Sequence, residues 1–423
     1  MITGKTECGL QYAVKRSGSA VGYCALSIRC GTRDESPDGS GRSSFHSGIA
    51  HFTEHTIFKG TEKKSASVIN GYLDRLGGEL NAYTTKEEIV LHATVLKEDL
   101  RKAASLLFEL ATSPTFPEDE TETEKGVVID EINSYKDAPA EEIYDMFEEM
   151  LFSGHPLSSP ILGTAASVKK IKSSELLKFV KEKFIPREMA FTIVADMEEK
   201  KMAGLAEDLS GKFFGREARP QDSRCTPGQL YTRKPAIPVN RFDKTVSRKS
   251  HQANCVIGGL APSLYEEKER ITTVLLCNIL GGPANNSILN SVLREKNGWV
   301  YGIECSYTQY ADTGIVAICL GCDRENIEKC MKAIDKELYR IQNIPMSPGR
   351  LKAAKKQLLG QLAISSDNGE TQCLSMGKSL LAYGQISSST QNKEKIEGIT
   401  SEDIQEMARK LFSPEKLSRL TFI

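Results

Sequence analysis

The chain has 423 residues, of which 39% are hydrophobic and 26% charged, and its formal net charge is -1. These values are typical of globular proteins and exclude a disordered or fibrous chain. The lack of a basic excess argues against binding to nucleic acid or to an anionic membrane surface. A chain this much longer than about 200 residues predicts two domains.

The N-terminal segment, MITGKTECGLQYAVKRSGSAV, lacks the apolar core of a secretory signal, and no later window has the length and apolarity of a membrane span. We therefore expect a cytoplasmic protein without membrane contact. The 11 cysteines are expected to be reduced and packed as small apolar residues. Cys319 and Cys322 form a CxxC pair, but no second pair completes a zinc site, so core packing is the preferred interpretation.

The stretch SGIAHFTEHTIFKGT, residues 47–61, predicts a short helix with unusual polar residues. His51, Glu54 and His55 share one face, because residues three and four apart lie together on a helix. Two imidazoles at this spacing can hold zinc, which then needs a third protein ligand and keeps one position for water. Glu54 would act as general base. The alternative interpretation is a helix with two partly exposed histidines and a solvated glutamate.

A second polar feature lies in the acidic helix predicted over ETEKGVVIDEINSY. Glu124 and Glu131 are two helical turns apart and share a face, and the other face of the helix is expected to carry Val127, Val128 and Ile132. Glu131 is the candidate third zinc ligand, and Glu124 is a candidate supporting carboxylate that orients a histidine. Alternatively, both carboxylates are solvated and favour the N-terminal end of the helix.

The two halves of the chain carry the same pattern of elements, which predicts a tandem repeat. The stretches 87–111 and 313–341 each read as a strand, a polar turn and an amphipathic helix. Later, residues 171–186 and 399–414 each predict a capped helix that stops before proline and leads into an apolar strand.

We therefore predict an α+β fold of two tandem homologous domains, each an antiparallel sheet covered by helices. The domains are assigned to residues 1–205 and 241–423, joined by a linker over 206–240 that is rich in proline, arginine and glycine. The second half has ILGGP, residues 279–283, where the first has HFTEH. The polar cluster is thus not a folding requirement, and the C-terminal domain is expected to lack a metal site.

These residues resemble the inverzincin metallopeptidases of the pitrilysin and insulysin family, most closely its mitochondrial processing peptidase-like branch in a two-domain, bacterial-type form. In the first half the resemblance is carried by the HxxEH sequence, by Glu124 and Glu131, and by the phrases GTRDE, FKGT and GGELNAYTT. In the second half it is carried by GGPANNSILNSVLREKNGWVYGIECS. The loop over 36–48 is longer than usual for the family and adds His46, which we expect at the surface.

The resemblance implies a role for each matching residue. His51, His55 and Glu131 would bind one Zn²⁺ per chain, Glu54 would deprotonate the attacking water, and Glu124 would support the site. An extended substrate would pair with the strand around Asn81 and Ala82. Arg294 and Tyr301, from the second half, would bind the substrate and stabilise the oxyanion; without the family, an ion pair and a packed aromatic are the simpler interpretations.

The resemblance also implies an assembly and a reaction. A chain of this length would form half of a clamshell chamber, closed by a second copy in a homodimer or by an inactive paralogue in a heterodimer. Such a chamber admits short or unfolded peptides, so the expected reaction is zinc-dependent endopeptidase cleavage. Two alternatives remain: a catalytically silent scaffold or assembly subunit of the same family, and a metal-free peptide-binding module.

Overall fold

The computed structural model describes residues 1–35, 45–215, 237–238, 240–248 and 251–423. The chain divides into two compact units, each built from three separate segments. Unit 1 comprises Met1–Asn133, Ser159–Gln229 and Ile364–Ile386, and unit 2 comprises Ser134–Ser158, Leu230–Ala363 and Ser387–Ile423. None of the helices in the described ranges combines the length and the apolarity that a bilayer crossing requires.

Unit 1 is built on a six-stranded sheet with the strand order β1-β2-β6-β3-β5-β4. The strands are β1 (Ile2–Lys5), β2 (Gln11–Arg16), β3 (Val21–Ile28), β4 (Glu79–Thr84), β5 (Ile89–Leu96) and β6 (Met189–Ala195). Neighbours are antiparallel except β2 and β6, which run parallel. The sheet is therefore mixed and not wholly antiparallel as expected; β2 and β6 are far apart in the sequence, so no hairpin constrains their direction.

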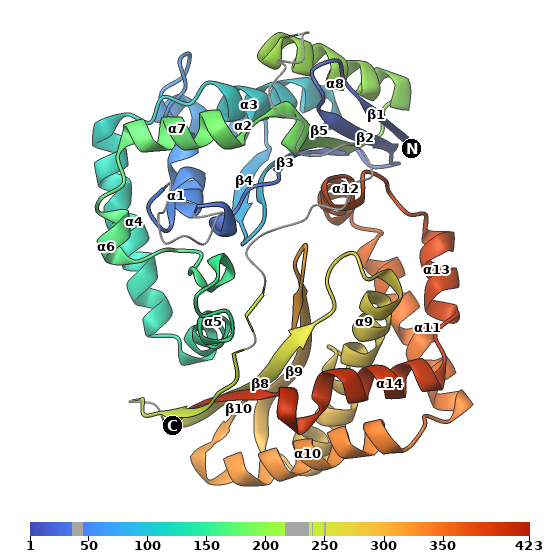
Figure 1. Cartoon of the computed structure of the whole chain (residues 1–423). Coiled ribbons are helices and arrows are strands. Elements are labelled where there is room, and N and C mark those ends of the chain that lie inside the picture. Colours follow the sequence, from blue (N-terminus) through green and yellow to red (C-terminus); the bar gives the residue numbers. More distant parts are fainter. Residues whose placement is uncertain (36–44, 216–236, 239, 249–250) are drawn as a thin grey trace. The chain divides into compact units, whose positions relative to one another are not determined.

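Helices cover both faces of the unit 1 sheet (Figure 1). On one face, α3 (Leu100–Thr112) and α8 (Glu199–Phe214) pack against the strands, and α7 (Ser173–Lys183) contacts α3. Alternation along β3 explains the two-sided burial: Cys24, Leu26 and Ile28 face this large core, while Ala25 faces the opposite one. Helix α8 extends into the segment predicted as linker, because Ala206 and Leu209 keep the helical spacing of buried residues.

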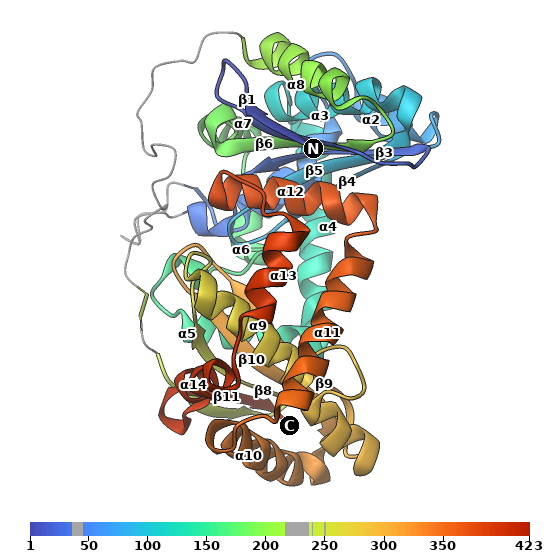
Figure 2. The same cartoon turned by 90° about the vertical axis from the view of Figure 1, so that its right-hand side faces the viewer.

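The opposite face of the unit 1 sheet is covered by α12 (Gly369–Tyr383), a helix from the last quarter of the chain (Figure 2). Cys373, Met376 and Leu380 pack there against Ala25 and Val194. The remaining helices of this unit are α1 (Ile49–Thr56), α2 (Ala66–Asp74) and α6 (Ala165–Val168), and α4 (Glu118–Lys136) begins in it. The compact unit thus draws on sequence well outside the range 1–205 that the repeat suggested.

Unit 2 repeats this plan on a five-stranded sheet with the order β7-β11-β8-β10-β9. The strands are β7 (Asp243–Val246), β8 (Gln252–Ala261), β9 (Val300–Gln309), β10 (Gly314–Asp323) and β11 (Ser418–Phe422). Here β7 and β11 are the parallel pair, as β2 and β6 are in unit 1. The matching order and directions agree with the tandem repeat read from the sequence.

The faces of the unit 2 sheet are covered in the same way. On one face lie α9 (Glu267–Gly281), α10 (Ile327–Asn343) and α14 (Ser401–Phe412), and on the other lies α5 (Pro139–Leu151), a helix from the first half of the chain. Two more helices, α11 (Pro348–Ser365) and α13 (Ser389–Glu397), complete the unit. The two halves have therefore exchanged one helix each, α5 for α12, which the sequence ranges did not predict.

Candidate metal site

Helix α1 carries the HFTEH sequence, and a buried side chain binds the backbone amides at its N-terminus. Both oxygens of the buried Glu35 carboxyl group accept backbone hydrogen bonds, from Gly48 N and from Ala50 N, each at 3.0 Å. Gly48 has a φ of 89°, a left-handed conformation that glycine adopts without strain. Burial raises the pKa of Glu35 to about 8, and the amides of Ala50 and Gly48 and the Lys86 cation oppose this rise.

The two histidines of α1 meet a glutamate of α4, the helix that lies beside α1 in Figure 1. One carboxylate oxygen of Glu131 is 3.8 Å from Nε2 of His51 and 3.3 Å from Nε2 of His55. One ligand atom from each of the three residues lies within 4.8 Å of the others. The residues predicted as zinc ligands are therefore brought together around one point.

The donor set fits a zinc ion by its chemistry. Both imidazoles turn Nε2 toward Glu131, and their ring centroids are 4.6 Å apart. Burial, and to a lesser degree His55, lower the pKa of His51 to about 3, so its imidazole is neutral, the form that binds a metal. Two imidazole nitrogens and one carboxylate oxygen make a set typical of catalytic zinc sites, in which water takes the fourth position.

Glu124 of α4 contacts the His55 ring on the side away from Glu131, the position expected of a supporting carboxylate. Its Oε1 accepts a hydrogen bond from Nδ1 of His55 at 3.0 Å, and its Oε2 lies 2.6 Å from Nζ of Lys59. Glu124 is 6% exposed. Sequence reasoning missed Lys59, although the quoted phrase FKGT contains it and it follows His55 at the helical spacing of four residues.

Glu54 lies on α1 between the two histidines and is half-buried. Burial raises the pKa of its carboxyl and Glu131 adds to the rise, whereas Thr84 and His55 oppose it. On α4 the apolar face was predicted wrongly. Val127 is 49% exposed, and Val128 and Ile132 are buried on the same side of the helix as Glu124, four and eight residues after it, and not on the opposite face. The buried apolar positions are Val128 and Ile132, which sit four residues apart, whereas Val127 is turned about 100° from Val128.

Asn81 and Ala82 lie on β4, at the edge of the unit 1 sheet. They pair with His92 and Leu91 of β5, and within the described ranges no strand pairs with the other side of β4. The backbone groups on that side are thus left without a strand partner among the described residues.

Arg294 and Tyr301 belong to unit 2. Arg294 lies in a π-helical turn over Asn290–Lys296, and Tyr301 lies on β9. Tyr301 is 58% exposed, and its hydroxyl donates a hydrogen bond to Asp323 at 2.7 Å. Their part in the site stays a prediction.

Two other sequence expectations concern His46 and the CxxC pair. His46 is exposed, as expected, and contacts the partly buried Glu175 through its backbone N–H, at 2.8 Å, and through Nδ1, at 2.9 Å. Residues 36–44 of its loop lie outside the described part. Cys319 and Cys322 are both free thiols on β10 and belong to different cores, on opposite faces of the sheet. They are packing residues, as expected.

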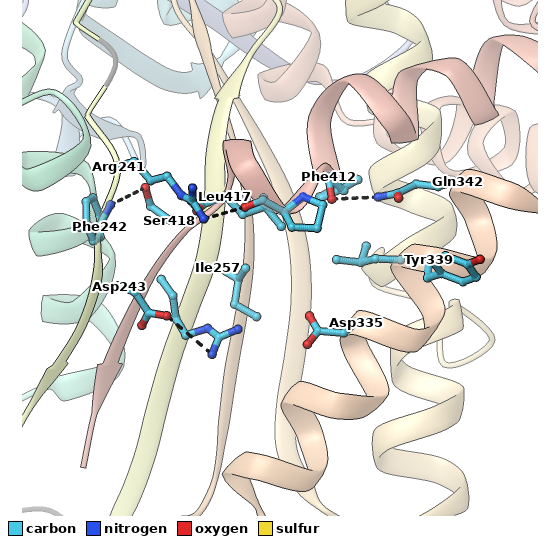
Figure 3. Close-up of a pocket in the computed structure, with 13 residues that line it drawn as sticks. Arg241, Phe242, Asp243, Ile257, Asp335, Tyr339, Gln342, Phe412, Leu417 and Ser418 are labelled. Carbon is cyan, nitrogen blue, oxygen red and sulfur yellow. Dashed lines mark hydrogen bonds and ion pairs between the residues drawn. The ribbon is translucent and has the colours of Figure 1, made fainter.

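A hollow of about 820 Å³ in unit 2 offers no second candidate for this chemistry (Figure 3). Two of its polar side chains form hydrogen bonds with neighbouring backbone carbonyls. Arg241 donates to those of Pro414 and Leu417, and Gln342 donates to that of Phe412. Among the residues that the structure describes, the one group with three metal-ligating side chains is that of His51, His55 and Glu131.

An α+β scaffold that holds two histidines and a glutamate around one point defines a candidate metal-dependent hydrolase. Residues 12–165 match the family model described as Insulinase (Peptidase family M16), and residues 170–358 match the one described as Peptidase M16 inactive domain. The chain belongs to peptidase family M16. The three candidate ligands, His51, His55 and Glu131, all lie within the segment that matches the first of the two descriptions.

Named relatives agree with this assignment, and solved structures share the fold. An uncharacterized zinc protease of Bacillus subtilis is 27% identical over 389 residues, which cover 92% of this chain and 90% of the relative. One of Mycobacterium tuberculosis is 29% identical over 366 residues, covering 86% and 82%. The crystal structure of a protease from Helicobacter pylori has a TM-score of 0.87 at 19% identity, covering 100% of this chain and 99% of that one.

A second solved structure, the peptidase M16 inactive domain from Pseudomonas fluorescens, has a TM-score of 0.86 at 19% identity and covers 100% of this chain and 97% of its own. At this level of identity the two likenesses establish the fold. The curated relatives establish that proteins similar to this chain are named zinc proteases.

Proposed function

We propose that the chain is a zinc-dependent endopeptidase that cleaves short or unfolded peptides. The observation that carries the proposal is the convergence of His51, His55 and Glu131, whose ligand atoms lie within 4.8 Å of one another. These three residues would hold one zinc ion per chain. When bound, zinc lowers the pKa of its water toward neutrality and polarises the carbonyl of a peptide bond.

The chain's own residues supply the remaining steps. Glu54, half-buried beside the ligands, accepts the proton of the attacking water and passes it to the amine that leaves. Glu124 holds His55 through the hydrogen bond to Nδ1. The open side of β4, at Asn81 and Ala82, aligns an extended peptide by backbone pairing, which demands little of the substrate's side chains.

Arg294 and Tyr301 would complete the site as donors to the substrate and the developing oxyanion. We further propose a place in the mitochondrial processing peptidase-like branch, a cytoplasmic location, and a closed chamber formed with a second subunit. A homodimer is the simplest assembly, and a heterodimer with an inactive paralogue is the rival. Both follow from the family plan in which two such chains enclose the substrate.

A catalytically silent scaffold is the second candidate, since one matching domain description and one structural relative carry the word inactive. That description matches residues 170–358, beyond the two helices that carry the ligands. The retention of His51, Glu54, His55 and Glu131 favours an active enzyme over a scaffold. It also disfavours a metal-free peptide-binding module, which would need none of them.

The test compares the parent with Glu54→Gln by elemental analysis and by cleavage of a quenched fluorescent peptide library. We expect about one zinc per chain in both proteins and loss of cleavage in Glu54→Gln only, because that change removes the base and no ligand. Glu118→Gln, at an exposed position of α4, is the matched control and should cleave normally. His51→Ala should release the metal.

Each contrary outcome selects another function. A parent that binds zinc and cleaves no peptide would favour the scaffold, and a parent without zinc would favour the binding module. Full activity in Glu54→Gln would remove Glu54 from its assigned role.

A further inference from the structure

Lys59 is connected to the candidate metal site through Glu124. Nζ of Lys59 lies 2.6 Å from Oε2 of Glu124, and Oε1 of the same carboxylate accepts the hydrogen bond from Nδ1 of His55. Nε2 on the far side of the His55 ring faces Glu131. Lys59, Glu124, His55 and Glu131 therefore form one continuous line of contacts that ends at the metal position.

The carboxylate in the middle of this line is poorly hydrated. The side chain of Glu124 is 8% exposed and that of Lys59 is 24% exposed. A carboxylate removed from water needs a partner for each oxygen, and a buried charge left without its counter-ion is costly. Lys59 occupies one oxygen, so the other remains aimed at the ring of His55.

We propose that Lys59 is a positioning residue of the metal site, which acts through Glu124 to hold His55 with Nε2 turned toward the metal and thereby tightens zinc binding. The inference rests on the zinc site of the proposed function and not on peptide cleavage. Groups that orient a ligating histidine commonly change metal affinity by about 10- to 100-fold when they are removed.

A purely structural role for such an ion pair can be separated from this one, because unit 1 contains a near-identical pair elsewhere. Nζ of Lys64 lies 2.5 Å from Oε2 of Glu109, with side-chain exposures of 20% and 7%. Glu109 also accepts a hydrogen bond from Thr61, and among the described residues no histidine contacts it. Lys64→Met thus removes the same kind of interaction without touching the metal site.

The experiment measures zinc affinity of the metal-stripped full chain by competition with a chromophoric chelator, together with thermal unfolding of the same metal-free proteins. We expect Lys59→Met to weaken zinc binding about tenfold or more. Lys64→Met should leave zinc affinity unchanged while lowering the unfolding temperature to a similar extent. Lys59→Arg, which keeps a cationic donor, should recover most of the affinity.

A double-mutant cycle tests the route through Glu124. If Lys59 acts through that carboxylate, Lys59→Met should have little further effect on zinc affinity in a Glu124→Gln background. Equal effects in both backgrounds would overturn the proposed route. If Lys59→Met fails to fold, the same cycle is run with Lys59→Gln.

The outcomes separate this inference from the proposed function. A parent that binds zinc tightly, with unchanged affinity in the Lys59 variants, refutes the positioning role and leaves the enzyme assignment intact. A parent that does not bind zinc refutes both.

Discussion

His51 and His55 use their second ring nitrogens differently. Nδ1 of His55 donates to Glu124, whereas Nδ1 of His51 is buried and has no hydrogen-bond partner within the described ranges. A hydrogen bond at the non-ligating nitrogen fixes the tautomer and the ring orientation of a metal-binding histidine. The support of the site by side chains is therefore concentrated on His55, which is why we expect zinc affinity to be sensitive to Glu124 and Lys59.

At the same scale, Tyr301 offers a test of the donors assigned to unit 2. Its side chain is 58% exposed and its hydroxyl bonds only to Asp323 among the contacts observed, so Tyr301→Phe should cost little stability. If the hydroxyl stabilises the oxyanion, the change should lower turnover by about 10²- to 10³-fold and leave the zinc content at one per chain.

The control for this prediction is Tyr339→Phe, a tyrosine of α10 that is 69% exposed. Steady-state cleavage of a fluorogenic peptide and elemental analysis of both variants provide the measurements. Equal turnover in the two variants would reduce Tyr301 to a surface residue.

Among the elements, α1 depends on a partner that is distant from its own residues in the sequence. Glu35 accepts the amides of Gly48 and Ala50 and is 2% exposed, so water cannot replace it. Without this carboxylate, two amides at the start of the ligand-bearing helix lose their acceptors. Glu35→Ala should lower the free energy of unfolding by about 2 kcal/mol and loosen the helix.

Hydrogen exchange of the metal-free protein checks this prediction, because faster exchange should be confined to α1 and its neighbours. Thr400→Ala, which removes the side-chain cap of α14, is the control and should leave exchange in α1 unchanged. Unaltered protection of α1 in Glu35→Ala would show that the rest of unit 1 holds the helix without Glu35.

Element types followed largely from periodicity. Apolar runs and the three-to-four spacing of helices located β5, β6, β10 and β11 and the helices next to them in the sequence. The seven-residue separation of Glu124 and Glu131 placed both on one side of α4, and in the structure this side faces α1. Val127 was misplaced because the exposed edge of a short apolar run cannot be recognised without knowing what packs on it.

In the whole molecule, the exchange of α5 and α12 makes each sheet depend on the other half of the chain. Gly377 of α12 lies so close to β3 that an added Cβ would be 2.5 Å from Oγ of Ser27. Gly377→Ala should therefore destabilise unit 1 by about 1–3 kcal/mol, although alanine is the better helix former. The change tests whether a residue late in the sequence supports the unit that holds the metal site.

Gly204 provides the matched control, since it lies in α8 of the same unit and an added Cβ would meet no atom within 4 Å. Gly204→Ala should raise stability by about 0.5–1 kcal/mol. Denaturant unfolding of both variants measures the difference. Stabilisation by Gly377→Ala would show that α12 does not pack closely on the sheet in solution.

The sequence by itself determined the candidate ligands and the repeated order of elements, because both depend on local spacing: residues three, four or seven apart fall on one helical face wherever the helix lies. It did not reveal that Lys59 meets Glu124, that β2 and β6 run parallel, or that α5 and α12 change places. Those features join residues far apart in the chain. Only the packing of complete helices and sheets decides which distant partners satisfy a buried charge or cover an apolar face.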